Sequence, residues 1–187
     1  MRLFAAVELL PELRQALRKL VGRLAMSQAD VKWVEGENFH LTLLFLGEVD
    51  RELLPELSRA LAEAARGVPA FHLRLEGLGT FPGPGRPRVI WVGADGGGEL
   101  GRLQSRVVEQ AGPFAERPPE RTPFHPHITL GRVRSPRGLA GLKALLEEYR
   151  EEKVGVQEVS GFSLVESRLY RSGPVYTTVD HFWLERA

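Results

Sequence analysis

A tetrapeptide of the form His-apolar-Thr-apolar occurs twice in the chain, at residues 40–43 and again at residues 127–130. Successive side chains on a β-strand point to opposite faces, so each His shares a face with its Thr, and the two apolar residues share the other. Any half-buried strand alternates in this way, so one copy alone would carry little weight. Two copies, one in each half of a chain with only five histidines, predict two strands with a common polar role.

The rest of the chain alternates between helix and strand patterns. Apolar residues at helical spacing predict amphipathic helices over residues 11–25, 53–65, 100–111 and 139–149. Strand patterns occupy residues 3–9, 31–34, 39–46, 71–75, 88–92, 124–132, 154–165 and 175–184. Glycine and proline predict a loop over residues 79–88, a turn at 96–98, and an end to the first motif strand at Gly47.

This order of elements predicts an α+β fold with two similar lobes, because each half carries one motif strand followed by a helix. The adjacent strand patterns within 71–92 and 154–184 favour antiparallel hairpins over a doubly wound parallel sheet. We expect one two-lobed domain over residues 1–187 and a monomer. The halves share little identity outside the motif, so an internal duplication is a hypothesis.

Composition limits the classes of function. The net charge is +1, so the chain lacks the overall basic field of proteins that bind long nucleic acids. It has no Cys, which excludes disulfides, thiolate nucleophiles and Cys-based zinc sites. The apolar run before Glu8 is too short for a signal peptide, and no segment is long enough to span a membrane. We therefore expect a cytoplasmic protein with no membrane partner.

The two motifs suit acid–base chemistry if their polar faces meet across a cleft. A neutral imidazole accepts a proton and a protonated one donates it, and the ordinary histidine pKa of about 6.5 permits both near neutral pH. Cleavage of a phosphodiester needs such a pair, one to activate the attacking oxygen and one to protonate the departing oxygen. The hydroxyls of Thr42 and Thr129 can donate hydrogen bonds to phosphate oxygens. Spacing alone leaves open whether His40 or His127 is the acid.

Arg132 is a candidate phosphate ligand, because a guanidinium can donate two hydrogen bonds to a phosphate at once. It lies five residues after His127, so on an unbroken strand it would point to the opposite face. A bend or bulge at Gly131 could redirect it toward the phosphate. The alternative is an exposed arginine at the end of a strand.

A metal site is the competing explanation for the histidines. His125 and His127 have a spacing that could bind zinc, copper or nickel, but no further tight cluster of His, Asp or Glu completes a ligand set. We expect no metal and no cofactor, and a structural or supporting role for His125. His72 is expected to be exposed to solvent, and His181 exposed or structural.

The sequence resembles the two-histidine phosphoesterases with paired His-x-Thr-x motifs, and most closely the bacterial and archaeal RNA 2′,3′-cyclic phosphodiesterases, also called 2′-5′ RNA ligases. The resemblance runs nearly the full length, through residues 2–9, Trp33, 38–47, 81–91, 126–132, 164–167 and 173–176. It implies two pseudo-symmetric lobes, mostly antiparallel sheets with outer helices, and motif strands that line a central cleft. The residue before the arginine is often Ala in relatives and is Gly131 here.

By position, the resemblance makes His40 the proton donor, His127 the proton acceptor, and Thr42, Thr129 and Arg132 the phosphate contacts. It implies metal-independent hydrolysis of a terminal 2′,3′-cyclic phosphate on RNA to a 2′-phosphate, with 2′-5′ ligation as the reverse chemistry. The alternatives are a phosphodiesterase of small cyclic or 2′-5′-linked nucleotides, and a nucleotide- or RNA-binding module without turnover. A pure binder would not need two proton-transfer groups.

Overall fold

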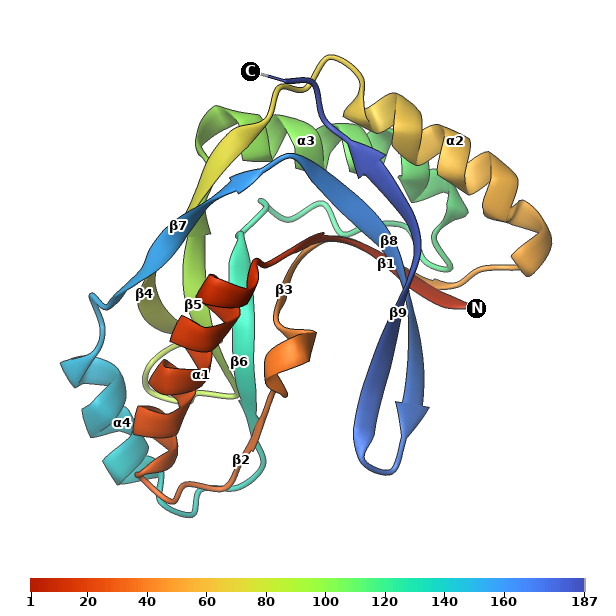
Figure 1. Cartoon of the computed structure of the whole chain (residues 1–187). Helices are drawn as coiled ribbons and strands as arrows, with labels where there is room; N and C mark the ends of the chain where they lie inside the picture. The colour runs from red at the N-terminus through yellow and green to blue at the C-terminus, as the bar shows by residue number, and fades with distance from the viewer. Residues whose placement is uncertain (187) are drawn as a thin grey trace.

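The computed structural model describes residues 1–186, which form one curled sheet of nine strands together with four α-helices (Figure 1). The strands are β1 (Arg2–Glu8), β2 (Val31–Trp33), β3 (His40–Glu48), β4 (Phe71–Phe81), β5 (Val89–Asp95), β6 (His127–Val133), β7 (Lys153–Val159), β8 (Gly161–Tyr170) and β9 (Gly173–Trp183). The helices are α1 (Pro11–Ala25), α2 (Leu54–Ala65), α3 (Gly97–Ala111) and α4 (Leu139–Glu148), with short 3-10 turns η1 (Gly36–Asn38), η2 (Arg51–Leu53) and η3 (Gly112–Phe114).

The sheet is built around its two motif strands. Its order is β7-β4-β5-β6-β3-β1-β8-β9, with β2 paired to β6, and all of these pairings are antiparallel. Strands β6 and β3 meet at the centre through the pair Ile128 and Leu41. We call β2, β4, β5, β6 and β7 the β6 half, and β1, β3, β8 and β9 the β3 half. The predicted two-lobed α+β fold is confirmed.

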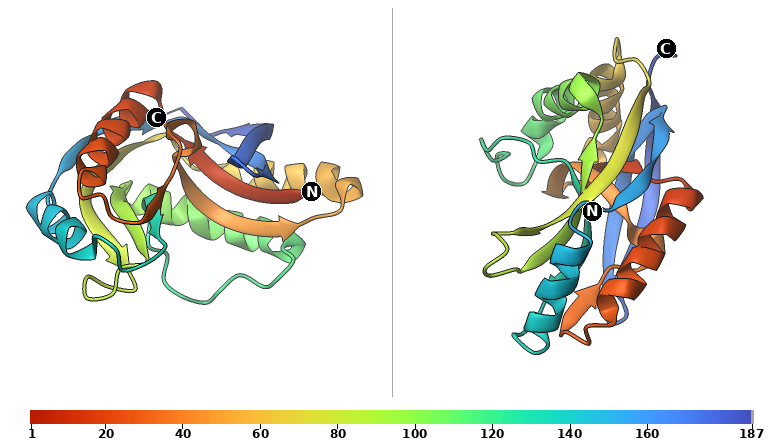
Figure 2. Two further views of the ribbon diagram at one scale, coloured as in Figure 1. Left: turned by 90° about the horizontal axis from the view of Figure 1, so that it is seen from below. Right: turned by 90° about the vertical axis from the view of Figure 1, so that its left-hand side faces the viewer.

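The two lobes do not follow the order of the sequence. Strand β4 comes from the first half of the chain but pairs with β5 and β7, whereas β8 and β9 come from the second half and join β1. Helices α1 and α4 lie against the β6 half, and α2 and α3 pack together mainly over the β3 half (Figures 1 and 2). Each lobe therefore needs segments from both halves of the chain.

The helices cover the apolar face of the sheet. In α1, which starts with Pro11 in its first turn, four leucines at helical spacing are at most 5% exposed: Leu13, Leu17, Leu20 and Leu24. They join one core with the inward residues of the strands, including Leu41, Leu43, Ile128 and Leu130. The predicted helix over 11–25 is confirmed.

The predicted loop over residues 79–88 is wrong at its start, because β4 continues to Phe81. Gly79 pairs with Trp91 on β5, and a Cβ added to Gly79 would clash with the indole ring. Gly79 is therefore a strand residue and not part of a turn. Its lack of a side chain allows the aromatic ring of Trp91 to pack against the backbone.

Other boundaries also differ from the prediction, among them the start of the second motif strand, which begins at His127 and not at residue 124. The single strand expected over 154–165 is two strands, because the chain crosses at Ser160 from β7 in the β6 half to β8 in the β3 half. Helix α3 begins at Gly97, within the predicted turn. Strand β3 runs through Gly47 to Glu48, with Gly47 at a φ of 72°, a conformation that glycine adopts at little cost.

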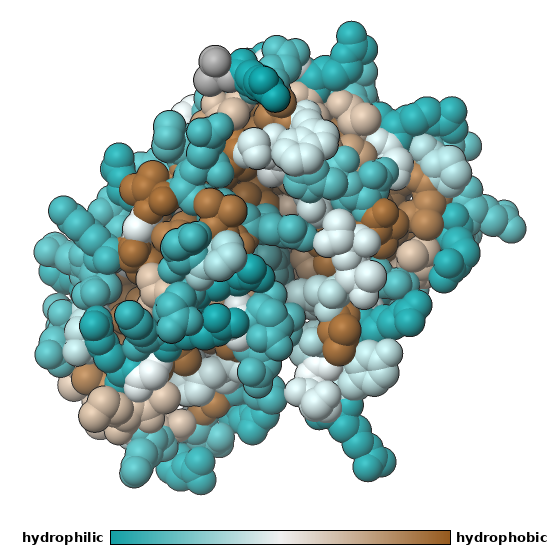
Figure 3. All heavy atoms as spheres, viewed as in Figure 1, coloured by the Kyte–Doolittle hydropathy of each residue, from teal (hydrophilic) through white to brown (hydrophobic). Residues whose placement is uncertain are grey.

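The face seen in Figure 3 is mostly hydrophilic, with hydrophobic side chains gathered in patches. The β8–β9 hairpin projects from the body, and a notch separates its tip from the β6 half (Figures 1 and 3). Among residues 1–186, no helix combines the length and the apolar character needed to cross a bilayer.

Candidate active site

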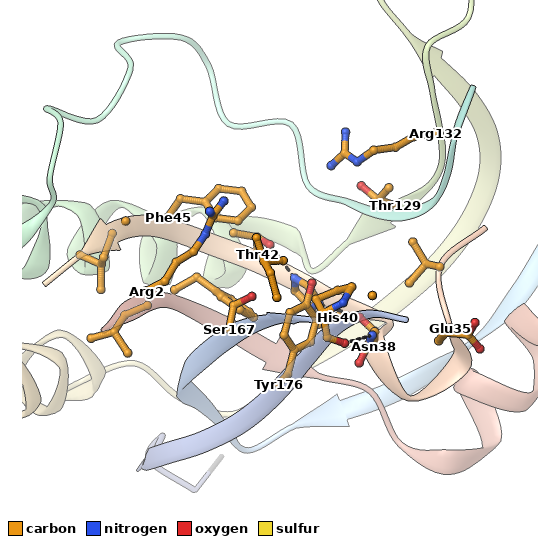
Figure 4. Close-up of a pocket in the computed structure, with 18 of the residues that line it drawn as sticks. Arg2, Glu35, Asn38, His40, Thr42, Phe45, Thr129, Arg132, Ser167 and Tyr176 are labelled. Atoms are coloured by element: carbon orange, nitrogen blue, oxygen red, sulfur yellow. Dashed lines mark hydrogen bonds between the residues drawn. The ribbon is translucent and has the colours of Figure 1, made fainter. Parts of the chain in front are cut away.

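A cleft of about 780 Å³ lies on the polar face of the sheet. Both motifs line it through His40 and Thr42 on β3 and through His127 and Thr129 on β6, and Arg132 lines it as well. The structure therefore brings all five predicted site residues to one cleft, and Figure 4 shows four of them there, His40, Thr42, Thr129 and Arg132.

Strand alternation sets the direction of the first four residues of each motif. Leu41 and Leu43 are buried, while His40 and Thr42 are half-buried and face the cleft. On β6 the apolar residues at 128 and 130 are buried in the same way, and the polar residues at 127 and 129 face the cleft.

Both motif strands then carry a bulge at the same position. The register skips Leu43 where β3 pairs with β1, and it skips Leu130 where β6 pairs with β5. Two consecutive residues of each strand are consequently buried, and the sixth residue of each motif turns into the cleft. That residue is Phe45 on β3. On β6 it is Arg132, where the bulge lies at Leu130, one residue before the glycine at which a bend could redirect the arginine.

The local packing explains why residue 131 is a glycine. It pairs with Trp33 of β2, and an added Cβ would lie 2.8 Å from the side chains of Trp33 and Val31. Glycine at this position lets β2 pack closely against β6, next to the bulge that directs Arg132.

A hydrogen bond to the backbone carbonyl two residues earlier orients each of the two imidazoles. The Nδ1 atom of His40 lies 2.8 Å from the carbonyl oxygen of Asn38, and the Nδ1 atom of His127 lies 2.6 Å from that of His125. A carbonyl only accepts, so each Nδ1 carries the proton and each Nε2 is left for chemistry. The Nε2 atom of His40 lies 2.9 Å from the hydroxyl oxygen of Thr42.

Aromatic side chains hold the rings in place. The ring centroid of His40 is 4.8 Å from that of Phe4 and 5.4 Å from that of Tyr176, which meets it edge-on. The ring of His127 is 5.0 Å from Phe81, also edge-on. Such contacts fix the plane of each imidazole.

His125 belongs to the support of His127. Its ring lies 4.8 Å from Trp91 and 5.2 Å from Phe81, and its carbonyl accepts the Nδ1 proton of His127. This agrees with the supporting role expected for it. His72 is exposed on β4, and His181 contacts the hydroxyl of Ser163 through Nδ1 at 2.9 Å. Within residues 1–186, no group of three or more His, Asp or Glu side chains could hold a metal ion.

Burial lowers the pKa of both histidines from its ordinary value. For His40, desolvation is the largest cause, the Asn38 carbonyl opposes it, and the charge of His127 lowers the pKa further. For His127, desolvation again comes first, the His125 carbonyl opposes it, and the charges of His125 and Arg132 lower it. The charge of His127 thus acts on His40 across the cleft.

These shifts predict an acid-side activity profile. A lowered pKa means that the protonated form of each histidine disappears at a lower pH than that of an ordinary histidine. We expect a bell-shaped dependence of kcat/KM on pH, with both apparent pKa values below about 6.5, because kcat/KM reports the free enzyme. Proton NMR of the imidazole Cε1–H signals should give the same two values. Activity that still rises above pH 7 would contradict this electrostatic description.

Several residues that line the cleft were not predicted from the sequence, among them Phe45, Asn38 and Tyr176. Phe45 had a usable signal, because the echo between the motifs extends to the sixth residue. Asn38 donates a hydrogen bond from Nδ2 to the carbonyl of Pro174 on the β8–β9 hairpin, at 3.1 Å. That contact joins residues 136 positions apart, so no local pattern could indicate it.

Comparison with known proteins gives consistent matches. A family model described as LigT like Phosphoesterase matches twice, over residues 7–91 and 92–176, which fits the suspected internal duplication. An RNA 2′,3′-cyclic phosphodiesterase of Aeropyrum pernix is 43% identical over 167 residues, which cover 87% of this chain and 92% of that protein.

Solved structures match over nearly the whole length. TT0787 of Thermus thermophilus superposes with a TM-score of 0.79 and 37% identity, covering 100% of this chain and 99% of that one. LigT of E. coli in complex with 3′-AMP has a TM-score of 0.78 and 30% identity, covering 98% and 97%.

Proposed function

Because the chain belongs to the LigT-like phosphoesterase family, we propose that it is a hydrolase that opens the terminal 2′,3′-cyclic phosphate of RNA to a 2′-phosphomonoester. The observation that carries this proposal is the pair of motif histidines in one cleft, each with Nδ1 tied to a backbone carbonyl and Nε2 left for proton transfer. Relatives named RNA 2′,3′-cyclic phosphodiesterase, among them that of Aeropyrum pernix, support the choice of substrate.

In the proposed reaction His127 is the general base and His40 the general acid. Nε2 of His127 takes a proton from water as the water oxygen forms a bond to phosphorus. The bond from phosphorus to O3′ breaks, and His40 delivers the Nε2 proton to O3′. One water is consumed, and the product has a 2′-phosphate and a free 3′-hydroxyl. A 5′-hydroxyl of RNA in place of water would give a 2′-5′ linkage.

The remaining residues would stabilise the charge that develops on the phosphate. The hydroxyls of Thr42 and Thr129 and the guanidinium of Arg132 line the cleft beside the two imidazoles. Arg132 can donate two parallel hydrogen bonds to the non-bridging oxygens, and preorganised donors of this kind stabilise a transition state more than a ground state. Thr42 would exchange its contact with His40 for one with the substrate.

The proposed chemistry uses only imidazole, hydroxyl and guanidinium groups, so we expect activity without a metal ion. Hydrolysis of a 2′,3′-cyclic mononucleotide should proceed at the same rate before and after exhaustive treatment with EDTA. The rate should also be insensitive to added Mg²⁺, Mn²⁺ or Zn²⁺ at micromolar concentrations. Loss of activity after chelation, with recovery on adding one particular divalent ion, would refute the metal-free scheme.

A further inference from the structure

The cleft is also lined by an arginine that lies away from Arg132 and that the proposed chemistry does not use. Arg2 lies on β1, is exposed, and lines the cleft. Figure 4 shows its side chain extended beside Phe45 and near Ser167, away from Thr129 and Arg132. Arg2 belongs to the face of β1 that also carries Phe4 and Ala6, because residues two apart on a strand share a face.

No protein carboxylate neutralises Arg2 within residues 1–186, where it forms neither an ion pair nor a side-chain hydrogen bond. Its cross-strand neighbour Glu48 contacts the amino group of Met1 at 3.3 Å instead. Glu116 also lines this end of the cleft, and its Oε2 accepts a hydrogen bond from the backbone N–H of Glu48 at 3.1 Å. A guanidinium left free in a concave site is suited to an external anion.

The position of Arg2 matches a second phosphate rather than the reacting one. Ala6 pairs with Thr42, and Arg2 lies four residues further along β1, about 13 Å away at the usual rise of a strand. The side chain extends back into the cleft beside Phe45. Burial raises the pKa of Tyr176, whose ring contacts His40, and the charges of Arg132 and then Arg2 oppose this rise. Arg2 therefore lies further along the cleft than the proton-transfer groups, and not beside them.

Two further cations, Lys32 and Arg117, line the cleft. Lys32 pairs directly with Arg132 across β2 and β6, so its charge lies on the side of the reacting phosphate. Arg117 follows η3, where the backbone N–H of residue 116 donates a hydrogen bond to the carbonyl of Leu46 at 2.7 Å. Arg117 is therefore the alternative to Arg2 as the ligand of a second phosphate. Of these two arginines, Arg2 lies on a strand within the sheet, which fixes its backbone, whereas Arg117 lies in a loop.

We propose that Arg2 binds the phosphate on the 5′ side of the terminal nucleotide, and that the cleft is built for an RNA strand rather than for a mononucleotide. This inference rests on the proposed function, which places the cyclic phosphate between His40 and His127. Grooves for single-stranded RNA follow the backbone with positive charge in this way.

The test compares two mononucleotide substrates that differ by one group. Each is a nucleoside 2′,3′-cyclic phosphate, one with a 5′-hydroxyl and one with a 5′-phosphate. The readout is the ratio of their kcat/KM values. We expect the 5′-phosphate to raise kcat/KM by about 10-fold in the natural protein, the scale of one charge-assisted contact. Arg2→Gln should bring the ratio close to one, and Arg2→Lys should keep part of it.

Arg59→Gln is the matched control, because Arg59 is an exposed arginine on α2 outside the cleft, and it should keep the full ratio. A ratio that survives Arg2→Gln, a ratio of one in the natural protein, or a ratio lost instead in Lys32→Gln or Arg117→Gln would each overturn the assignment. Hydrolysis of the 5′-hydroxyl substrate reports separately on the proposed function. If that substrate is not hydrolysed, calorimetry of a nucleoside 2′,5′-bisphosphate against the 2′-monophosphate gives the same comparison as a ratio of Kd values.

Discussion

Alanine in place of either His40 or His127 is expected to lower kcat/KM for a 2′,3′-cyclic nucleotide by about 100- to 10,000-fold, the usual contribution of a general acid or base. Each variant loses one of the two proton transfers that the reaction needs. The other groups of the cleft, including Thr129 and Arg132, stay in place and can still bind the phosphate. The loss should therefore fall mainly on kcat and less on KM.

The double variant should be little worse than either single one, because the two histidines act in the same step. Independent contributions would instead multiply. His72→Ala is the matched control, since His72 is exposed on β4 outside the cleft, and it should retain full activity. Most of the activity remaining in either single variant would overturn the assignment of the acid–base pair.

The controls must separate catalysis from folding. His40 packs against Phe4 and Tyr176, so alanine leaves a gap among aromatic rings. His40→Gln fills more of that space while it removes the proton-transfer group. We expect His40→Gln to be nearly as inactive as His40→Ala but closer to the natural protein in Tm.

Much of the local structure could be predicted because it depends on periodicity. The leucines of α1 recur every three or four residues, and the apolar and polar residues of the motif alternate. Both elements and their buried faces therefore follow from the sequence. The bulge that turns Arg132 toward the cleft could also be anticipated, because a guanidinium five residues after the histidine needs such a break to share its face.

The arrangement of the lobes could not be predicted in the same way. Ser160 and Gly161 form a dipeptide typical of turns, but it does not indicate that the chain leaves one half of the sheet for the other, because the strand pattern continues on both sides of it. Tyr176 reaches His40 only because β9 pairs with β8 and β8 with β1. Such contacts depend on tertiary pairing, which a local pattern does not contain.

The second large effect concerns which isomer is formed. A 2′,3′-cyclic phosphate has two possible leaving oxygens, O2′ and O3′. Water must enter opposite the oxygen that leaves, and the acid must lie beside that oxygen. With one fixed donor and one fixed acceptor, the cleft aligns only one of these paths well. We expect one isomer to dominate the product.

The surroundings of the two histidines support the direction of the reaction. His40 is enclosed by Phe4 and Tyr176, and its Nε2 already contacts the hydroxyl of Thr42, so it has less room than His127 for an attacking water. Nε2 of His127 has no hydrogen-bond partner within residues 1–186 and can bind a water molecule. Attack by water activated at His127, with departure of O3′ toward His40, leaves the phosphate on O2′.

The most direct test is phosphorus NMR of a 2′,3′-cyclic mononucleotide during hydrolysis by the natural protein in EDTA. The 2′- and 3′-monophosphates give separate signals, so one spectrum reports both turnover and regiochemistry. Acid–base opening by His40 and His127 in the proposed roles predicts loss of the cyclic signal and growth of the 2′-phosphate signal almost alone. A predominantly 3′-phosphate product, or no turnover of the cyclic phosphate, would contradict it.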